Sequence, residues 1–109
     1  MEEEWMAIPD PIRRFVEATN SGNNEAFLDT FTADAFISDW GRSFLGRGEI
    51  SSWNQSDNIG VQSNLRIVRF EGDHDVCRVR MAVTGNGFNG EGDMMFKLDD
   101  GRISQLIIS

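Results

Sequence analysis

The segment FTADAFISDWG, residues 31–41, is the point at which the hydrophobic pattern of the chain changes from helical to extended. From Asp34 to Trp40, aromatic and β-branched residues occur in the alternating pattern that is typical of a strand. Successive side chains of a strand point to opposite faces, so Ala35 and Ile37 share a face with Asp39. We therefore expect a strand that ends at Asp39 and presents its carboxylate on a face with apolar neighbours.

Two helices are predicted before this segment. In the first, Asp10-Pro11 supplies an N-cap and a proline at the first helical position, and Gly22 follows the end. Its apolar face consists of Ile12, Phe15, Val16 and Thr19. Asn23 or Asn24 then caps a short second helix that is expected to run through Phe31.

After the segment, Gly41-Arg42 indicates a turn into a brief strand at Ser43–Leu45, and a third helix is predicted near Glu49–Asn54. The remaining chain alternates in four runs: Leu65–Phe70, Val76–Thr84, Asp93–Leu98 and Arg102–Ile108. Helices that precede a meander of long strands indicate an α+β fold. We expect the helices on one face of a curved antiparallel sheet, rather than a doubly wound parallel sheet.

The length and charge of the chain restrict its possible partners. A chain of 109 residues is long enough for one domain, which we assign to residues 1–109. The net charge of −8 opposes binding to nucleic acid or to an anionic membrane surface. Cys77 has no internal disulfide partner and is expected in the core. The acidic segment Met1–Trp5 does not resemble a secretory signal, so we expect a cytoplasmic protein.

Two motifs that suggest cofactors are better explained as turns. Gly85–Gly90 matches the dinucleotide-binding fingerprint, but that fingerprint requires a strand that leads into a helix, whereas a second strand follows here. Asp73-His74-Asp75 contains the only histidine, and adjacent residues on an extended chain point in opposite directions. We therefore predict hairpin turns, no cofactor and no metal site, although Phe88 could still cover the mouth of a cavity.

The order of these elements resembles that of the nuclear transport factor 2-like superfamily, and within it the SnoaL-like and ketosteroid-isomerase-like small proteins. The residues that carry the resemblance are Phe15–Gly22, Phe31–Ala35, Asp39 with Gly41, Gly46–Ile50 and Phe96–Ile103. The resemblance implies a cone-shaped roll, also found in cystatin-like folds: a strongly curved antiparallel sheet packed against three N-terminal helices around an apolar cavity. Such folds host isomerases, cyclases, dehydratases, hydrolases and non-catalytic binders.

The resemblance also implies roles for individual residues. In ketosteroid isomerases, a strand-end aspartate moves a proton between carbons while a tyrosine and a protonated aspartic acid hold the enolate oxygen. Asp39 falls at the position of the base, but Phe15 replaces the tyrosine. If the last hairpin is matched to the family by its strand residues, Met94 falls at the position of the second acid. If the match makes no allowance for a shorter turn in this chain, Asp93 falls there instead. We prefer Met94, which shares its parity with apolar residues, so ketosteroid isomerase chemistry of the known kind is disfavoured.

Two hypotheses of function follow. In the first, the chain is an acid–base enzyme of isomerase or cyclase type, which acts on a small apolar carbonyl compound with Asp39 as proton shuttle. The expected cavity lining is Phe15, Phe27, Trp40, Trp53 and Met94. In the second, the chain is a non-catalytic ligand-binding or dimerisation module, and Asp39 caps the turn at Gly41 or pairs with Arg42 or Arg47.

A homodimer is expected as well. The last strand carries Leu106 and Ile108 on one face and Ile103 and Ile107 on the other. One apolar face can pack under the helices. We expect a second copy of the chain to cover the other.

Overall fold

The computed structural model describes residues 2–109, with side chains from Trp5 onward. Its elements are α1 (Glu2–Ala7), α2 (Asp10–Ser21), α3 (Asn24–Asp29), β1 (Phe31–Asp39), β2 (Arg42–Leu45), α4 (Gly46–Asp57), the 3-10 turn η1 (Ile59–Val61), β3 (Asn64–Gly72), β4 (Val76–Thr84), β5 (Gly90–Asp99) and β6 (Arg102–Ile108). The predicted α+β class is confirmed. Helix α1 was not predicted, and most of the acidic N-terminal segment that suggested a cytoplasmic protein lies outside the described side chains.

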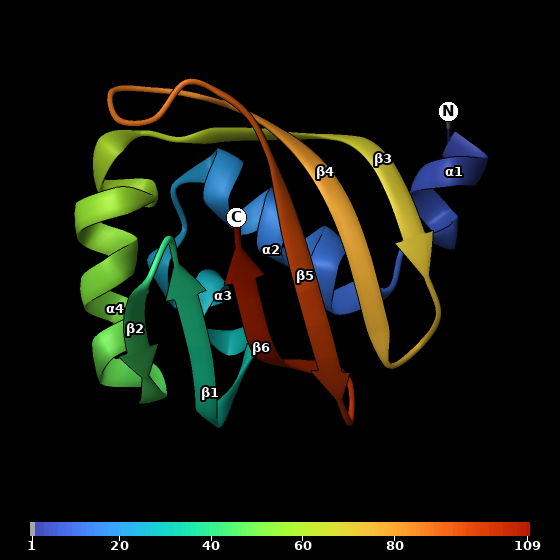
Figure 1. The fold of residues 1–109 in the computed structure, drawn as a ribbon, viewed down its shortest axis with the longest axis horizontal. Coiled ribbons are helices and arrows are strands. Elements are labelled where there is room, and N and C mark those ends of the chain that lie inside the picture. Colours follow the sequence, from blue (N-terminus) through green and yellow to red (C-terminus); the bar gives the residue numbers. More distant parts are fainter. Residues whose placement is uncertain (1) are drawn as a thin grey trace.

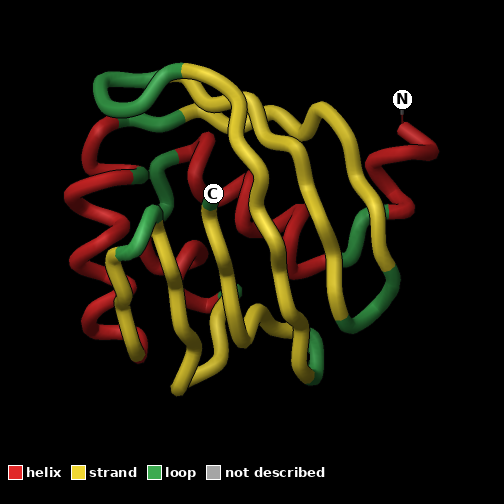
Figure 2. Tube along the Cα trace, viewed as in Figure 1, coloured by secondary structure: helices red, strands yellow, loops and turns green. Residues whose placement is uncertain are grey.

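One curved, unclosed sheet of six strands carries the fold, and the helices lie on one side of it (Figures 1 and 2). The strand order is β2-β1-β6-β5-β4-β3. Neighbouring strands are antiparallel except β1 and β6, which are parallel. The chain therefore forms β3 to β6 as the predicted meander and places the earlier hairpin of β1 and β2 against its last strand.

The two helices predicted before β1 differ from the prediction at one boundary each. Pro9, not Asp10, is the N-cap of α2, and the Asp10 carboxylate pairs with Arg13 and Arg14 within the helix. Helix α3 ends at Asp29 instead of Phe31. The chain turns to strand earlier because Phe31 is already in register with Ile103 of β6, a tertiary pairing that local periodicity does not reveal.

The hairpin between β1 and β2 closes through a two-residue turn at Trp40 and Gly41. Both residues have positive φ, 51° and 89°, which is the backbone of a type I′ turn. This turn matches the right-handed twist of the two strands and places Arg42 directly opposite Asp39 in the register. The side chains of Asp39 and Arg42 therefore lie on the same face of the hairpin.

The facing of the last strand was predicted wrongly at one residue. The register between β5 and β6 passes from Lys97 opposite Gln105 to Leu98 opposite Ile103, so Ser104 is an extra residue in a bulge. The bulge turns Ile103 into the core together with Leu106, whereas Ile107 remains half-buried on the outer face.

The core fills the space between the helices and the concave face of the sheet. A cluster of aromatic rings occupies its centre: Phe15, Phe27, Phe31, Phe96 and Trp53. Cys77 is buried, as predicted. Gly85–Gly90 connects β4 to β5, and Asp73–Asp75 connects β3 to β4, so both motifs form the predicted turns.

Candidate functional site

A cavity of about 270 Å³ lies at the end of the sheet where β1 and β6 finish. Its walls come from these strand ends, the last turn of α4, the chain around η1 and the loop between β4 and β5. Five of the residues predicted for the site line it: Phe15, Asp39, Trp40, Trp53 and Met94. Phe27 does not line it and packs behind it, with ring-centroid distances of 5.3 Å to Phe15 and 6.2 Å to Trp53.

Asp39 is the most buried acidic group in the described lining of this cavity. The residue is 9% exposed, because the alternation of β1 turns its side chain to the concave face of the sheet. Its Oδ2 atom accepts a hydrogen bond from Trp53 Nε1 at 3.0 Å and another from Arg42 Nη2 at 2.6 Å. Both donors bind the same oxygen, and they fix the plane and direction of the carboxylate.

The other carboxylate oxygen, Oδ1, has no hydrogen-bond partner among the residues that the structure describes. In that part of the chain, no fully buried side-chain oxygen or nitrogen lacks a partner, so Oδ1 is reached by solvent. Asp39 is a wall residue of the cavity. The arrangement leaves one oriented oxygen that can accept a proton or a hydrogen bond from a molecule in the cavity.

Arg42 links Asp39 to a second carboxylate at the rim. Its Nη2 and Nη1 atoms lie 2.9 Å and 3.3 Å from the two carboxylate oxygens of Asp57. Burial raises the pKa of Asp57. The hydrogen bonds from Arg42 and Ser56 and the charge of Arg42 together lower it by more, so the pKa lies below its ordinary value. The Asp57 hydrogen bond likewise raises the pKa of Arg42, so this guanidinium is a permanent cation.

Of the two arginines expected as partners of Asp39, only one contacts it. Arg42 pairs with it, whereas Arg47 donates to the carbonyl oxygen of Phe31 at 2.7 Å. The ion pair with Arg42 occupies only one of the two carboxylate oxygens of Asp39, so the other stays reachable by solvent.

Two exposed aromatic residues flank the mouth of the cavity. Trp40 is 75% exposed because the turn points its side chain away from the core, and Phe88 is 59% exposed at the loop between β4 and β5. Both also line the cavity. They provide apolar surface where a ligand would enter.

The positions of the two ketosteroid isomerase donors are apolar in this fold. Phe15 is completely buried and Met94 nearly so, and both line the cavity. Neither side chain can donate a hydrogen bond to a developing oxyanion. Any polar contact with a ligand must come from other residues of the lining.

Sequence reasoning missed several polar residues of the lining: Ser56, Asp57, Asn58, Ser63 and Glu91. They belong to the end of α4, the chain after η1 and the start of β5, which only tertiary folding brings beside β1. Buried amides hold this arrangement in place, since Asn58 Nδ2 donates to Thr19 Oγ1 and to Asn54 Oδ1, each at 3.0 Å.

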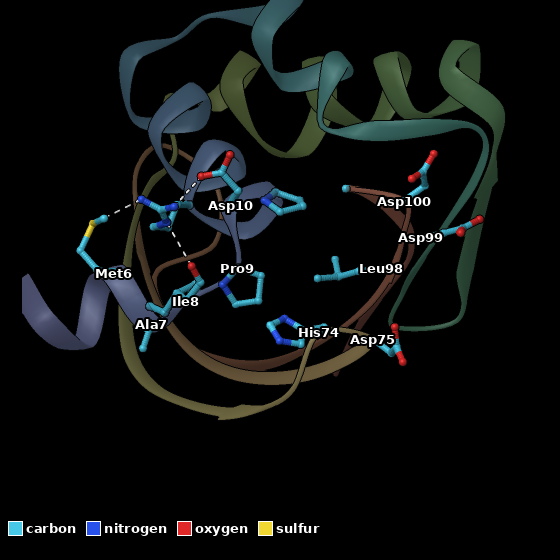
Figure 3. Close-up of a pocket in the computed structure, with 13 residues that line it drawn as sticks. Met6, Ala7, Ile8, Pro9, Asp10, His74, Asp75, Leu98, Asp99 and Asp100 are labelled. Atoms are coloured by element: carbon cyan, nitrogen blue, oxygen red, sulfur yellow. Dashed lines mark hydrogen bonds and ion pairs between the residues drawn. The ribbon is translucent and has the colours of Figure 1, made fainter.

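A second cavity of about 490 Å³ lies at the opposite end of β6 (Figure 3). It is bordered by the connection from α1 to α2 and by the turns that contain His74 and Asp99-Asp100. Arg13 donates there to the carbonyl oxygen of Ile8 at 3.0 Å and pairs with Asp10. Its acidic groups and His74 are exposed, and the described residues contain no group of three metal-ligating side chains. The Asp39 cavity is therefore the better candidate site.

The curved sheet, its helices and the inward strand-end aspartate define a nuclear transport factor 2-like protein. The SnoaL-like domain family matches residues 12–106, and the chain belongs to this family. No curated protein matches the chain in sequence. None of the described helices is long and apolar enough to cross a membrane.

Solved structures agree with this fold. A candidate polyketide cyclase from Sinorhizobium meliloti is 26% identical with a TM-score of 0.87, over 95% of this chain and 97% of the other. A protein of unknown function from Cytophaga hutchinsonii is 14% identical with a TM-score of 0.79, over 92% and 86%. A candidate ketosteroid isomerase from Kribbella flavida is 18% identical with a TM-score of 0.77, over 90% and 73%. The last two likenesses show the fold alone.

Proposed function

We propose that this SnoaL-like protein binds a small, largely apolar carbonyl compound in the Asp39 cavity and transfers protons to and from its carbon atoms. Asp39 acts as the proton shuttle. The observation that carries the proposal is the Asp39 carboxylate itself, which lines the cavity, is held through Oδ2, and has a solvent-reached Oδ1 with no partner among the described residues. A base positioned in this way needs no reorganisation when the substrate arrives.

The size and lining of the cavity support this class of ligand. About 270 Å³ is near the lower limit for pockets that hold drug-sized molecules, which suits one or two rings. Phe15, Trp40, Trp53 and Met94 offer apolar contact. The likeness to a candidate polyketide cyclase, at 26% identity, favours substrates with activated carbonyl groups over other apolar compounds.

Exchange of the protons beside a ketone tests the proposal without knowledge of the natural product. The probe is β-tetralone, a two-ring ketone, in deuterated buffer, with loss of its α-proton signals followed by NMR. We expect the wild-type protein to accelerate the exchange. Asp39→Asn should reduce the acceleration by about 100-fold or more, the usual contribution of a positioned general base.

The matched control is Asp34→Asn, because Asp34 lies on the same strand but is exposed to solvent. This variant should retain the wild-type exchange rate. Binding of β-tetralone, followed through tryptophan fluorescence, should be similar in the wild type and both variants, because the amide oxygen introduced by Asp39→Asn can still accept the hydrogen bond from Trp53. Wild-type exchange rates in Asp39→Asn would overturn the role of Asp39.

A non-catalytic binder is the second candidate function, and the ion pair of Asp39 with Arg42 favours it. In such a protein, Arg42 holds the carboxylate as a fixed hydrogen-bond acceptor, and the missing oxyanion donors at Phe15 and Met94 have no consequence. Saturable binding of β-tetralone without any acceleration of exchange would support this candidate over the enzyme.

We also propose that the outer face of the sheet forms a homodimer. Phe36 lies opposite Leu45 in the register between β1 and β2, and Ile107 lies opposite Met95 between β6 and β5. Phe36, Met95 and Ile107 each follow a buried residue of their strand and face away from the helices, and Leu45 shares the face of Phe36 through the register. Leu45 is 61% exposed and the other three are partly exposed, so a second copy of the chain would cover apolar side chains on four neighbouring strands.

A further inference from the structure

We propose that the hydroxyl group of Ser63 is the hydrogen-bond donor for the carbonyl oxygen of the ligand. The inference rests on the proposed function, because it names the polar contact that the Asp39 cavity makes with its carbonyl compound. It assigns to Ser63 a part of the task that a tyrosine and a protonated aspartic acid perform elsewhere in the superfamily, where this chain has Phe15 and Met94.

Ser63 is buried, lines the cavity and keeps its hydroxyl group free. The residue is 6% exposed. In the described part of the chain, no hydrogen bond involves its Oγ atom, while its backbone N–H donates to the carbonyl oxygen of Asn58 at 3.1 Å. Fully buried polar side-chain atoms without a partner are absent from the described residues, so the Oγ atom is reached by solvent, and the residue lines the cavity. A buried hydroxyl with no protein partner is uncommon unless a ligand or water completes it.

The backbone around Ser63 is held on two sides. The N–H of Asn86 donates to the carbonyl oxygen of Val61 at 2.8 Å and joins this segment to the loop between β4 and β5. Gly85 packs so closely that a Cβ atom there would lie 2.8 Å from the carbonyl oxygen of Gln62 and 3.0 Å from Cα of Ser63. The hydroxyl group is thus presented from a fixed position, which lowers the entropic cost of binding a ligand.

The other buried side-chain donors of the described lining already have partners. Trp53 donates to Asp39, and Asn58 donates to Thr19 and Asn54. Ionised Asp39 can only accept. Ser63 is therefore the buried side chain that can donate to a carbonyl oxygen while Asp39 accepts a proton from a neighbouring carbon.

The charges of the lining specify a neutral ligand. Asp39, Asp57 and Glu91 line the cavity. The single guanidinium of Arg42 is shared by the first two, and Arg80 is shared by Glu91 and Asp93, so carboxylates outnumber guanidinium groups. A carboxylate ligand would meet uncompensated negative charge. A ketone carries an acceptor oxygen without a charge, and its polarised carbonyl acidifies the adjacent C–H bonds.

The test compares two probes that differ only in the carbonyl group, β-tetralone and tetralin. Ser63→Ala should bind β-tetralone about fivefold more weakly than the wild type, as expected for loss of one neutral hydrogen bond. Its affinity for tetralin should stay within about twofold of the wild type, since the apolar contacts remain. The carbonyl stretch of bound β-tetralone should move to higher frequency in the variant.

Ser52→Ala is the control, because Ser52 is an exposed serine of α4 outside the cavity lining. It should bind both probes like the wild type. An unchanged affinity and carbonyl frequency for β-tetralone in Ser63→Ala would overturn the inference, whereas Asp39-dependent exchange would still support the proposed function. Failure of the wild type to bind either probe would instead overturn the proposed function and this inference together.

Discussion

Asp39 combines three features that have different ranges along the chain. The alternation of β1 turns it inward, the type I′ turn places Arg42 opposite it, and Trp53 reaches it from α4. The first two features are local, and the third depends on how α4 packs against the sheet. Since both donors bind Oδ2, the residue is oriented by the fold and not by a ligand.

The contribution of the Arg42–Asp57 ion pair to the free energy of unfolding should depend on pH. The pKa of Asp57 lies below its ordinary value of 3.8 in the folded protein. Its ionised form therefore stabilises the fold above pH 3.8, and this stabilisation is lost as the pH falls through the lower folded-state pKa. Asp57→Asn should lower the free energy of unfolding at neutral pH by up to ~1 kcal/mol, the range for partly exposed ion pairs.

Urea unfolding of the wild type and Asp57→Asn over a range of pH measures this effect. The difference in unfolding free energy should be constant near neutrality and shrink in acid. Asp34→Asn, at an exposed aspartate without an ion pair among the described residues, should show little difference throughout. A difference for Asp57→Asn that grows as the pH falls would contradict the assignment.

The hairpin of β1 and β2 is the element that sets the geometry of the site, and its turn is sensitive to side chains. Gly41 has φ of 89°, a conformation that costs other residues about 1–2 kcal/mol. Gly41→Ala should therefore lower the free energy of unfolding by about this amount. It should also weaken the pairing of Asp39 with Arg42. Because this pairing orients the proposed base, the rate of α-proton exchange should fall as well.

Gly48→Ala provides the matched control for the turn. Gly48 lies within α4, its φ is not positive, and an added Cβ atom would meet nothing within 4 Å. Alanine in a helix is better by about 0.5–1 kcal/mol, so this variant should be slightly more stable than the wild type. Equal effects of the two substitutions in chemical denaturation would argue against a strained turn at Gly41.

Several features with a short range along the chain were predictable from the sequence, although the N-cap of α2 was placed one residue late. Alternation identified the face of Asp39, and of the two predicted N-caps, Asn23 and Asn24, Asn23 accepts a hydrogen bond from the N–H of Ala26. The bulge at Ser104 was not predictable, because it arises from the register between β5 and β6. Ser63 and Asp57 carry no local signal either, since they reach the cavity only through the packing of α4 and η1 beside the sheet.

At the scale of the whole molecule, the candidate site and the proposed dimer surface occupy opposite faces of one sheet. Odd positions of β1 such as Ile37 and Asp39 face the helices, and even positions such as Phe36 face outward. The family resemblance predicted this cone correctly, but the parallel pairing of β1 with β6 depends on contacts between distant segments. Substitutions at Ile37 or Asp39 therefore change the inner face, and a substitution at Phe36 changes the outer face, so the two faces can be altered independently.

The homodimer is the prediction that belongs to this scale. Leu45 is 61% exposed on the outer face, so Leu45→Glu should leave the fold intact but place a charge within the proposed interface. Light scattering at micromolar concentration should give a dimer for the wild type and a lower mass for Leu45→Glu. Val68→Glu, on the edge strand β3 at the far end of the sheet, should stay dimeric. A monomeric wild type, or a dimer that Leu45→Glu does not weaken, would exclude this interface.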